Sequence, residues 1–149
     1  MKKITTAVIS YNAIPPYESG VTIINGRRAL ILPNTFNPKF PASVLPADPN
    51  WSLLLRHRDE LCKIIIFAGK KESGALEIID LAARSFCDKK ETLFFILCDH
   101  EIKEKTERLA QCGIPGKQYI CFSDSHERCR ETPFLLGFMH DYIENGQAP

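Results

Sequence analysis

"KIIIFAGKKESGALEIID", residues 63–80, decides the fold class, because it joins two kinds of hydrophobic pattern through a glycine. Its first part, KIIIF, is continuously apolar, which is typical of a strand that is covered on both faces. The segment SGALEIIDLAARSF, residues 73–86, carries apolar residues at helical spacing and predicts a helix. The expected buried face of this helix consists of Ala75, Ile79, Ala82, Ala83 and Phe86.

The rest of the carboxyl-terminal part repeats this alternation of apolar runs and helical patterns. Two further apolar runs, TLFFIL and QYICF, follow the same pattern as KIIIF, with a helical pattern over residues 99–113 between them. Ahead of residue 63, WSLLLRHRDELC predicts a helix with Asn50 or Asp48 as its cap. Its expected apolar face consists of Trp51, Leu54, Leu55, Leu61 and Cys62. Alternating strands and helices predict a parallel sheet between helices.

Residues 1–50 have a different pattern. ITTAVISYNAI is rich in β-branched residues, and VTIINGRRALIL is divided by Asn25-Gly26, the strongest short signal for a β-hairpin. Residues 33–50 are rich in proline, which excludes a helix or a central strand there. We therefore expect one α/β domain over residues 1–149. It would be a three-layer Rossmann-like or flavodoxin-like sandwich, with an antiparallel hairpin beside a parallel β-α-β-α-β-α part.

Composition limits the function classes. The chain has 149 residues and a formal net charge of +1, which disfavours binding of extended nucleic acid through a basic surface. None of the six cysteines forms a pair with the spacing of zinc ribbons or thioredoxin-like redox sites. No segment is apolar enough for a signal peptide or a membrane span. A reduced, cytoplasmic protein without a membrane segment is expected.

The loop after KIIIF is a candidate anion site. The start of a helix presents free N–H groups and a positive dipole end, and Lys70 and Lys71 add charge beside Ser73 and Gly74. Gly69 and Gly74 have the spacing of a Walker A loop, but the lysine and hydroxyl residue that should follow are replaced by Ala-Leu. A solvated turn in which Ser73 caps the helix explains the same residues.

Two acidic, histidine-containing segments follow the next strands. LCDHE contains Asp99 and His100, and FSDSHE contains Asp124 and His126. On neighbouring parallel strands these groups would lie close together, where they would suit acid–base chemistry or a divalent metal ion. Helix caps and exposed loop histidines account for the same pattern, and no metal or cofactor is assigned. Arg128 and Arg130 would add to an anion-attracting rim.

The segments IIIFAGKKESGALEI and LFFILCDHEIKEKTERL together resemble part of the toprim domains of topoisomerases and primases. In that family a glutamate follows the first core strand and an Asp-x-Asp ends a later one. Here Ala68 occupies the glutamate position, with Glu72 the only nearby substitute, and Asp99-His100-Glu101 stands in place of the second motif. The resemblance implies metal-dependent phosphoryl transfer as a minor alternative.

Two function classes remain open on the sequence. The first is a protein that binds a phosphorylated or nucleotide-like small anion at the carboxyl edge of the sheet, with or without acid–base or hydrolytic chemistry. The second is a non-catalytic interaction module. The helix expected from Pro133 to Ile143 is apolar nearly all round, which predicts either burial within the monomer against the sheet or a homodimer contact. The homodimer contact is the one that the second class would use.

Overall fold

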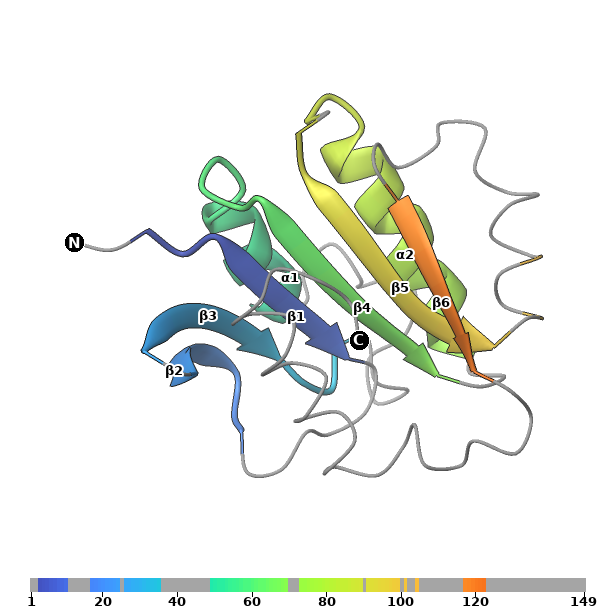
Figure 1. Ribbon diagram of the computed structural model, residues 1–149, viewed down its shortest axis with the longest axis horizontal. Coiled ribbons are helices and arrows are strands. Elements are labelled where there is room, and N and C mark those ends of the chain that lie inside the picture. The colour runs from blue at the N-terminus through green and yellow to red at the C-terminus, as the bar shows by residue number, and fades with distance from the viewer. Residues whose placement is uncertain are drawn as a thin grey trace.

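The computed structural model describes residues 3–10, 17–24, 26–35, 49–69, 73–89, 91–99, 101, 104 and 117–122. These residues form one six-stranded sheet and two helices, so the chain has the α/β character that the sequence predicts (Figure 1). The elements are β1 (Thr6–Ser10), β2 (Gly20–Ile24), β3 (Arg27–Leu32), α1 (Pro49–Arg56), β4 (Lys63–Gly69), α2 (Ser73–Phe86), β5 (Leu93–Asp99) and β6 (Lys117–Phe122).

The sheet is mixed, with strand order β2-β3-β1-β4-β5-β6. β3, β1, β4, β5 and β6 are parallel to their neighbours, and only β2 runs antiparallel, against β3. The three runs KIIIF, TLFFIL and QYICF form parallel strands, as predicted, and the structure adds that these strands are neighbours. The parallel part also includes β1 and β3, which the sequence assigned only to a β-rich region and a hairpin. β1 lies inside the sheet, between β3 and β4.

The hairpin predicted at Asn25-Gly26 is confirmed. β2 and β3 pair in a register that places Ile24 opposite Arg27, so the connection has two residues. Gly26 has a φ of 78°, in the region that glycine adopts without steric cost. Turns of this kind match the twist of the flanking strands, which explains why the Asn-Gly signal was decisive.

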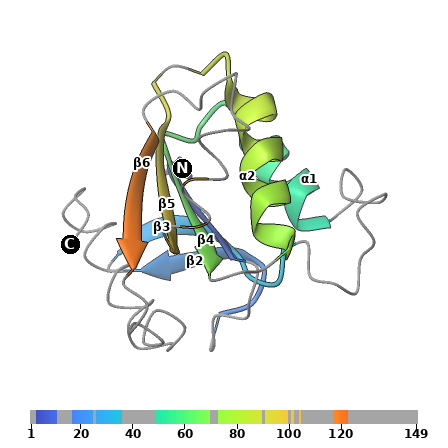
Figure 2. The ribbon, with the colours of Figure 1, turned by 90° about the vertical axis from the view of Figure 1, so that its right-hand side faces the viewer.

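The central strands are buried on both faces, as their continuous apolar runs predict. α1 and α2 lie on the same side of the sheet (Figure 2). Successive residues of a strand point to opposite faces. The sheet residues that form one core cluster with the helices are Ala7, Ile9, Leu30, Leu32, Ile64, Ile66, Phe94 and Ile96. Their neighbours on the other face are also buried, and these are Val8, Ile31, Ile65, Phe67 and Phe95.

The third layer remains a prediction. It depends on the helix expected from Pro133 to Ile143, which lies outside the described residues, as do residues 36–48 of the proline-rich stretch. Residues 101 and 104 are helical, in agreement with the helix expected over residues 99–113. No helix within the described ranges is long and apolar enough to cross a membrane.

α2 has the predicted bounds, and Ile79, Ala82, Ala83 and Phe86 of its expected apolar face are buried. The prediction for α1 was wrong at its carboxyl end. A helix expected to reach residue 62 ends at Arg56, and the chain turns over residues 57–60. Leu55 is consequently 39% exposed, and Cys62 is exposed as well. Trp51 and Leu54 are buried as expected, and Leu61 is buried from outside the helix.

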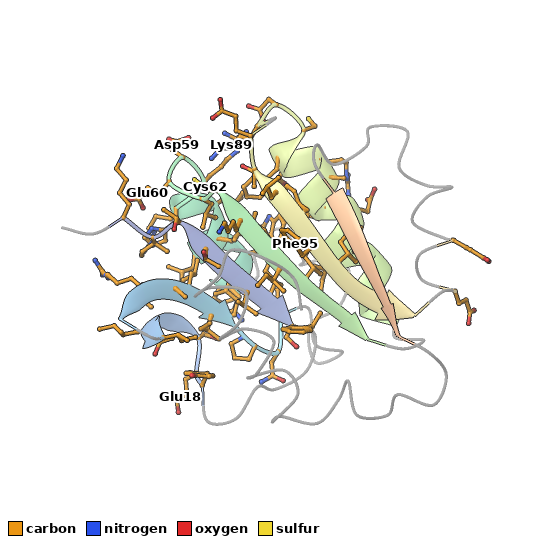
Figure 3. All side chains as sticks on the ribbon, viewed as in Figure 1. Glu18, Asp59, Glu60, Cys62, Lys89 and Phe95 are labelled. Atoms are coloured by element: carbon orange, nitrogen blue, oxygen red, sulfur yellow. The ribbon has the colours of Figure 1, made fainter. Side chains whose placement is uncertain are left out.

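The turn that ends α1 is tied to the loop after α2, at the amino edge of the sheet. Arg58 donates from Nε to the Ser85 carbonyl at 3.0 Å and forms an ion pair with Asp88. The hydrogen bond from Arg58 lowers the pKa of the Asp88 carboxyl. Lys89 donates to the carbonyls of Arg58 and Leu61. In Figure 3, Asp59, Glu60, Cys62 and Lys89 gather at this end, away from the strand tips. We call this set of contacts, made by Arg58 and Lys89, the amino-edge clasp; it stabilises the fold.

Candidate functional site

The candidate site is the opposite edge, where the parallel strands end. β4 ends at Gly69, β5 at Asp99 and β6 at Phe122, and these three strands are neighbours in the sheet. The register pairs Gly69 with Cys98 and Asp99 with Phe122. The arrowheads of β1, β4, β5 and β6 accordingly point the same way (Figure 1). The loops that follow these strands therefore start from one edge, the usual ligand position in open α/β sheets.

β4 is irregular where it reaches this edge. Its pairing with β5 runs from Phe67 opposite Leu97 to Gly69 opposite Cys98, which leaves Ala68 as an extra residue. A β-bulge of this kind bends a strand and increases its twist. Bulges are common next to functional sites, because they redirect the chain that follows. No signal for this bulge is visible in the sequence beyond Gly69 itself.

The predicted strand–loop–helix unit is confirmed. α2 begins at Ser73, so only residues 70–72 separate it from the end of β4. The first turn of a helix has N–H groups without partners inside the helix, together with the positive end of the dipole. Ser73 and Gly74 therefore lie at the same edge as Asp99. Lys70 and Lys71 lie outside the described residues.

The structure describes one residue of the predicted acid–histidine cluster, which consists of Asp99, His100, Asp124 and His126. Asp99 is the last residue of β5, and β6 is the adjacent strand, so the two acidic segments follow neighbouring strands as their grouping requires. His100, Asp124 and His126 are outside the described part of the chain. The same holds for the two arginines of the expected rim, Arg128 and Arg130. The register shows that β5 and β6 are adjacent as far as Asp99 and Phe122.

A polar cluster at the ends of β1 and β3 was not predicted. Thr35 is fully buried; its N–H donates to the Ser10 carbonyl at 2.9 Å, and its Oγ1 donates to the Leu32 carbonyl at 2.8 Å. Asn34, beside it, has a positive φ of 55°, which asparagine tolerates better than most residues. These bonds fix the turn after β3 against the end of β1.

Asn50 connects this turn to α1. Of the two predicted caps, Asn50 is wrong, and Asp48 lies outside the described residues. The helix begins at Pro49, so Asn50 lies within its first turn rather than before it. Its Nδ2 donates to the Pro33 carbonyl at 2.8 Å and to Thr35 Oγ1 at 3.2 Å. The start of α1 is thereby held at the carboxyl edge of the sheet. The sequence signal was the Pro-Asn-Thr turn at residues 33–35, but its partner lies across the proline-rich stretch.

We expect Thr35→Val to lower the free energy of unfolding by about 1–3 kcal/mol. Valine keeps the shape but leaves the Leu32 carbonyl and the Asn50 amide without a buried partner at Thr35. Urea unfolding followed by circular dichroism measures the change. Thr5→Val is the matched control, because Thr5 is exposed and should change stability by less than about 0.5 kcal/mol. Equal stabilities for the two variants would contradict the role of this turn.

Metal ligation has no support within the described ranges, where no group of three or more His, Cys, Asp or Glu residues could hold an ion. The two positions of the toprim-like motif, Ala68 and Asp99, lie near the ends of the adjacent strands β4 and β5. Ala68 lies in the bulge and carries no carboxylate.

Among known proteins, no family model, no curated protein and no solved structure matches the chain.

Proposed function

We propose that this protein binds a small phosphorylated or nucleotide-like anion at the carboxyl edge of its parallel sheet. The observation that carries the proposal is the position of α2: only three residues separate its start from the end of β4, at the edge where β5 and β6 also end. A helix start at a strand end favours a bound anion through its N–H groups and dipole.

The strand order supports a ligand at this edge. In chain order, the parallel strands are β1, β3, β4, β5 and β6, and in the sheet they lie as β3-β1-β4-β5-β6. This second-first-third-fourth-fifth order is that of flavodoxin-like, doubly wound folds, in which ligands bind where the order reverses. The reversal here falls between β1 and β4, whose last paired residues are Ser10 and Phe67. We infer that the chain has this three-layer architecture and that the loop after β4 flanks its crevice.

The residues of the site take separate roles in this proposal. Ser73 and Gly74 would offer backbone N–H groups to a phosphate or carboxylate, and Lys70 and Lys71 would supply positive charge. Arg128 and Arg130 would complete the rim from the loop after β6. The acid–histidine cluster would orient or ionise the bound molecule, and it consists of Asp99, His100, Asp124 and His126. Proton transfer and hydrolysis both suit these groups.

The test is ligand-induced stabilisation. Thermal unfolding is followed with inorganic phosphate, a nucleoside monophosphate and a sugar phosphate as probes, each over a range of concentrations. A ligand present at 100 times its Kd stabilises by about 2.7 kcal/mol, which raises Tm by roughly 5–10 °C in a chain of this size. We expect at least one probe to do so in the wild type. The double variant Lys70→Ala with Ser73→Ala should lose at least tenfold in affinity.

The matched control is Lys3→Ala with Ser85→Ala. Lys3 precedes β1 and Ser85 lies near the end of α2, so both belong to the opposite edge of the sheet. This control removes the same side-chain types and should leave the response to the ligand unchanged. A response that is equal in the site variant and the control would place the ligand elsewhere. No response to any phosphorylated probe would overturn the anion class.

A further inference from the structure

The outer edge of the sheet at β2 is apolar and exposed. β2 is the last strand on its side of the sheet, and no strand within the described ranges pairs with its outer edge (Figure 1). Val21 is 42% exposed and Ile23 is 69% exposed, whereas Ile24 is buried. Val21 and Ile23 are two residues apart, so their side chains point to the same face of the strand. The edge thus presents an apolar pair.

The same two residues direct their backbone groups outward. In an antiparallel hairpin with a two-residue connection, the pair that flanks the turn exchanges both hydrogen bonds, and such pairs alternate along the ladder. Ile24 opposite Arg27 is that first pair, and Thr22 opposite Ala29 is the next hydrogen-bonded one. Val21 and Ile23 belong to the intervening pairs. Their N–H and C=O groups therefore point away from β3, toward the open edge.

β2 lacks the features that usually protect such an edge. Natural edge strands carry charged residues, prolines or bulges that prevent pairing with another chain. Gly20–Ile24 contains neither a charge nor a proline, and its pairing with β3 is regular. Among the described residues, β2 is thus an unpaired, regular and uncharged edge strand, and such a strand is a template for one more strand.

We infer that this added strand is β2 of a second copy of the chain, in antiparallel orientation and centred on Thr22. In that register Val21 of one copy lies opposite Ile23 of the other, so both outward-facing residues of each strand form hydrogen-bonded pairs. A two-fold axis through the Thr22 pair keeps all four apolar side chains on one face. The contact is thus self-complementary in its hydrogen bonds and in its side chains.

Charge supports the antiparallel orientation. Glu18 is exposed just before β2 (Figure 3). At the other end of the hairpin, β3 begins with Arg27-Arg28. The register centred on Thr22 brings Glu18 of one copy opposite Gly26 of the other, next to the start of β3 at Arg27. Parallel pairing would instead bring the two arginine-bearing ends together. Opposite charges at both ends favour the antiparallel dimer and fix its register.

The contact consists of one short strand from each copy, which is small for a stable complex, so we expect a weak dimer. Sedimentation velocity at protein concentrations between about 1 µM and 1 mM tests the inference. We expect the wild type to dimerise. Ile23→Lys should weaken the dimer at least tenfold, because it places one lysine from each copy among the four apolar side chains of the contact. Leu55→Lys on α1 is its matched control, because Leu55 is also a partly exposed apolar residue. Val21→Pro should have a similar effect, because it removes an outward donor but no bond to β3.

Glu18→Arg gives an independent test at an exposed position, with Glu91→Arg as its matched control. It should weaken the dimer, whereas the control should not. Far-UV circular dichroism of every variant verifies that the fold is retained. A wild type that stays monomeric at 1 mM overturns the inference. So does a dimer that Ile23→Lys, Val21→Pro and Glu18→Arg all leave intact, which would place the contact on another surface.

Discussion

Phe86→Ala is expected to lower the free energy of unfolding by about 3–5 kcal/mol. Phe86 is fully buried and is the last residue of α2. Its ring meets Phe94 of β5 edge to face, with centroids 5.7 Å apart, and the Arg58 guanidinium carbon lies 5.7 Å from its centroid. Truncation therefore leaves a cavity between helix and sheet and also removes an aromatic and a cation–π contact. Domains of this size have only about 5–15 kcal/mol of stability.

The experiment is urea unfolding, followed by the fluorescence of Trp51, the only tryptophan, which is buried on α1. Cys87→Ala is the matched control: the next residue along the chain is exposed and should change stability by less than about 0.5 kcal/mol. Phe86→Leu, which keeps much of the volume, should fall between the two. If Phe86→Ala were no worse than Cys87→Ala, the packing of α2 on β5 would be contradicted.

The elements that the sequence predicted well are those with a strong local pattern. β4 is continuously apolar, α2 has a helical stripe, and Asn25-Gly26 requires a turn. Each of these signals lies within a few residues, so no knowledge of distant contacts was needed. The end of α1 was missed because its pattern continues past Arg56. The contacts of Arg58 and Lys89, which connect residues far apart in the sequence, hold the following turn instead.

The strand order had to come from the structure. β1 pairs with β3 on one side and with β4 on the other, and Thr6 lies opposite Lys63 across a long separation in sequence. Local patterns identify strands but carry no information about which strands pair. The position of the order reversal between β1 and β4, which supports the ligand proposal, was therefore invisible in the sequence.

The position of the candidate site at the edge of the sheet was predictable from the sequence, but the contacts around it were not. Strand ends and the helix start at Ser73 follow from the hydrophobic pattern, and the common edge follows from parallel pairing. The bulge at Ala68 and the bonds from Asn50 to Pro33 and Thr35 depend on tertiary packing. Short motifs name candidate groups, but only packing decides where those groups meet.

The second large effect is expected at the amino-edge clasp. Lys89→Met should lower the free energy of unfolding by about 1.5–3 kcal/mol, because the ammonium is the charged donor to two backbone carbonyls. Methionine keeps the apolar stem, so the loss reports the hydrogen bonds rather than packing. Lys3→Met, at an exposed position, is the control and should be close to neutral. Urea unfolding measures both variants.

A double-mutant cycle separates the contribution of the shared carbonyl. Lys89 Nζ donates to the Leu61 carbonyl at 3.0 Å, and the buried Thr92 Oγ1 donates to the same oxygen at 3.2 Å. Either single variant leaves the carbonyl one of these side-chain donors, whereas Lys89→Met with Thr92→Val removes both. The double variant should therefore lose about 0.5–1 kcal/mol more than the sum of the single losses. Additive losses would show that the two side chains act independently and that the clasp is not one cooperative unit.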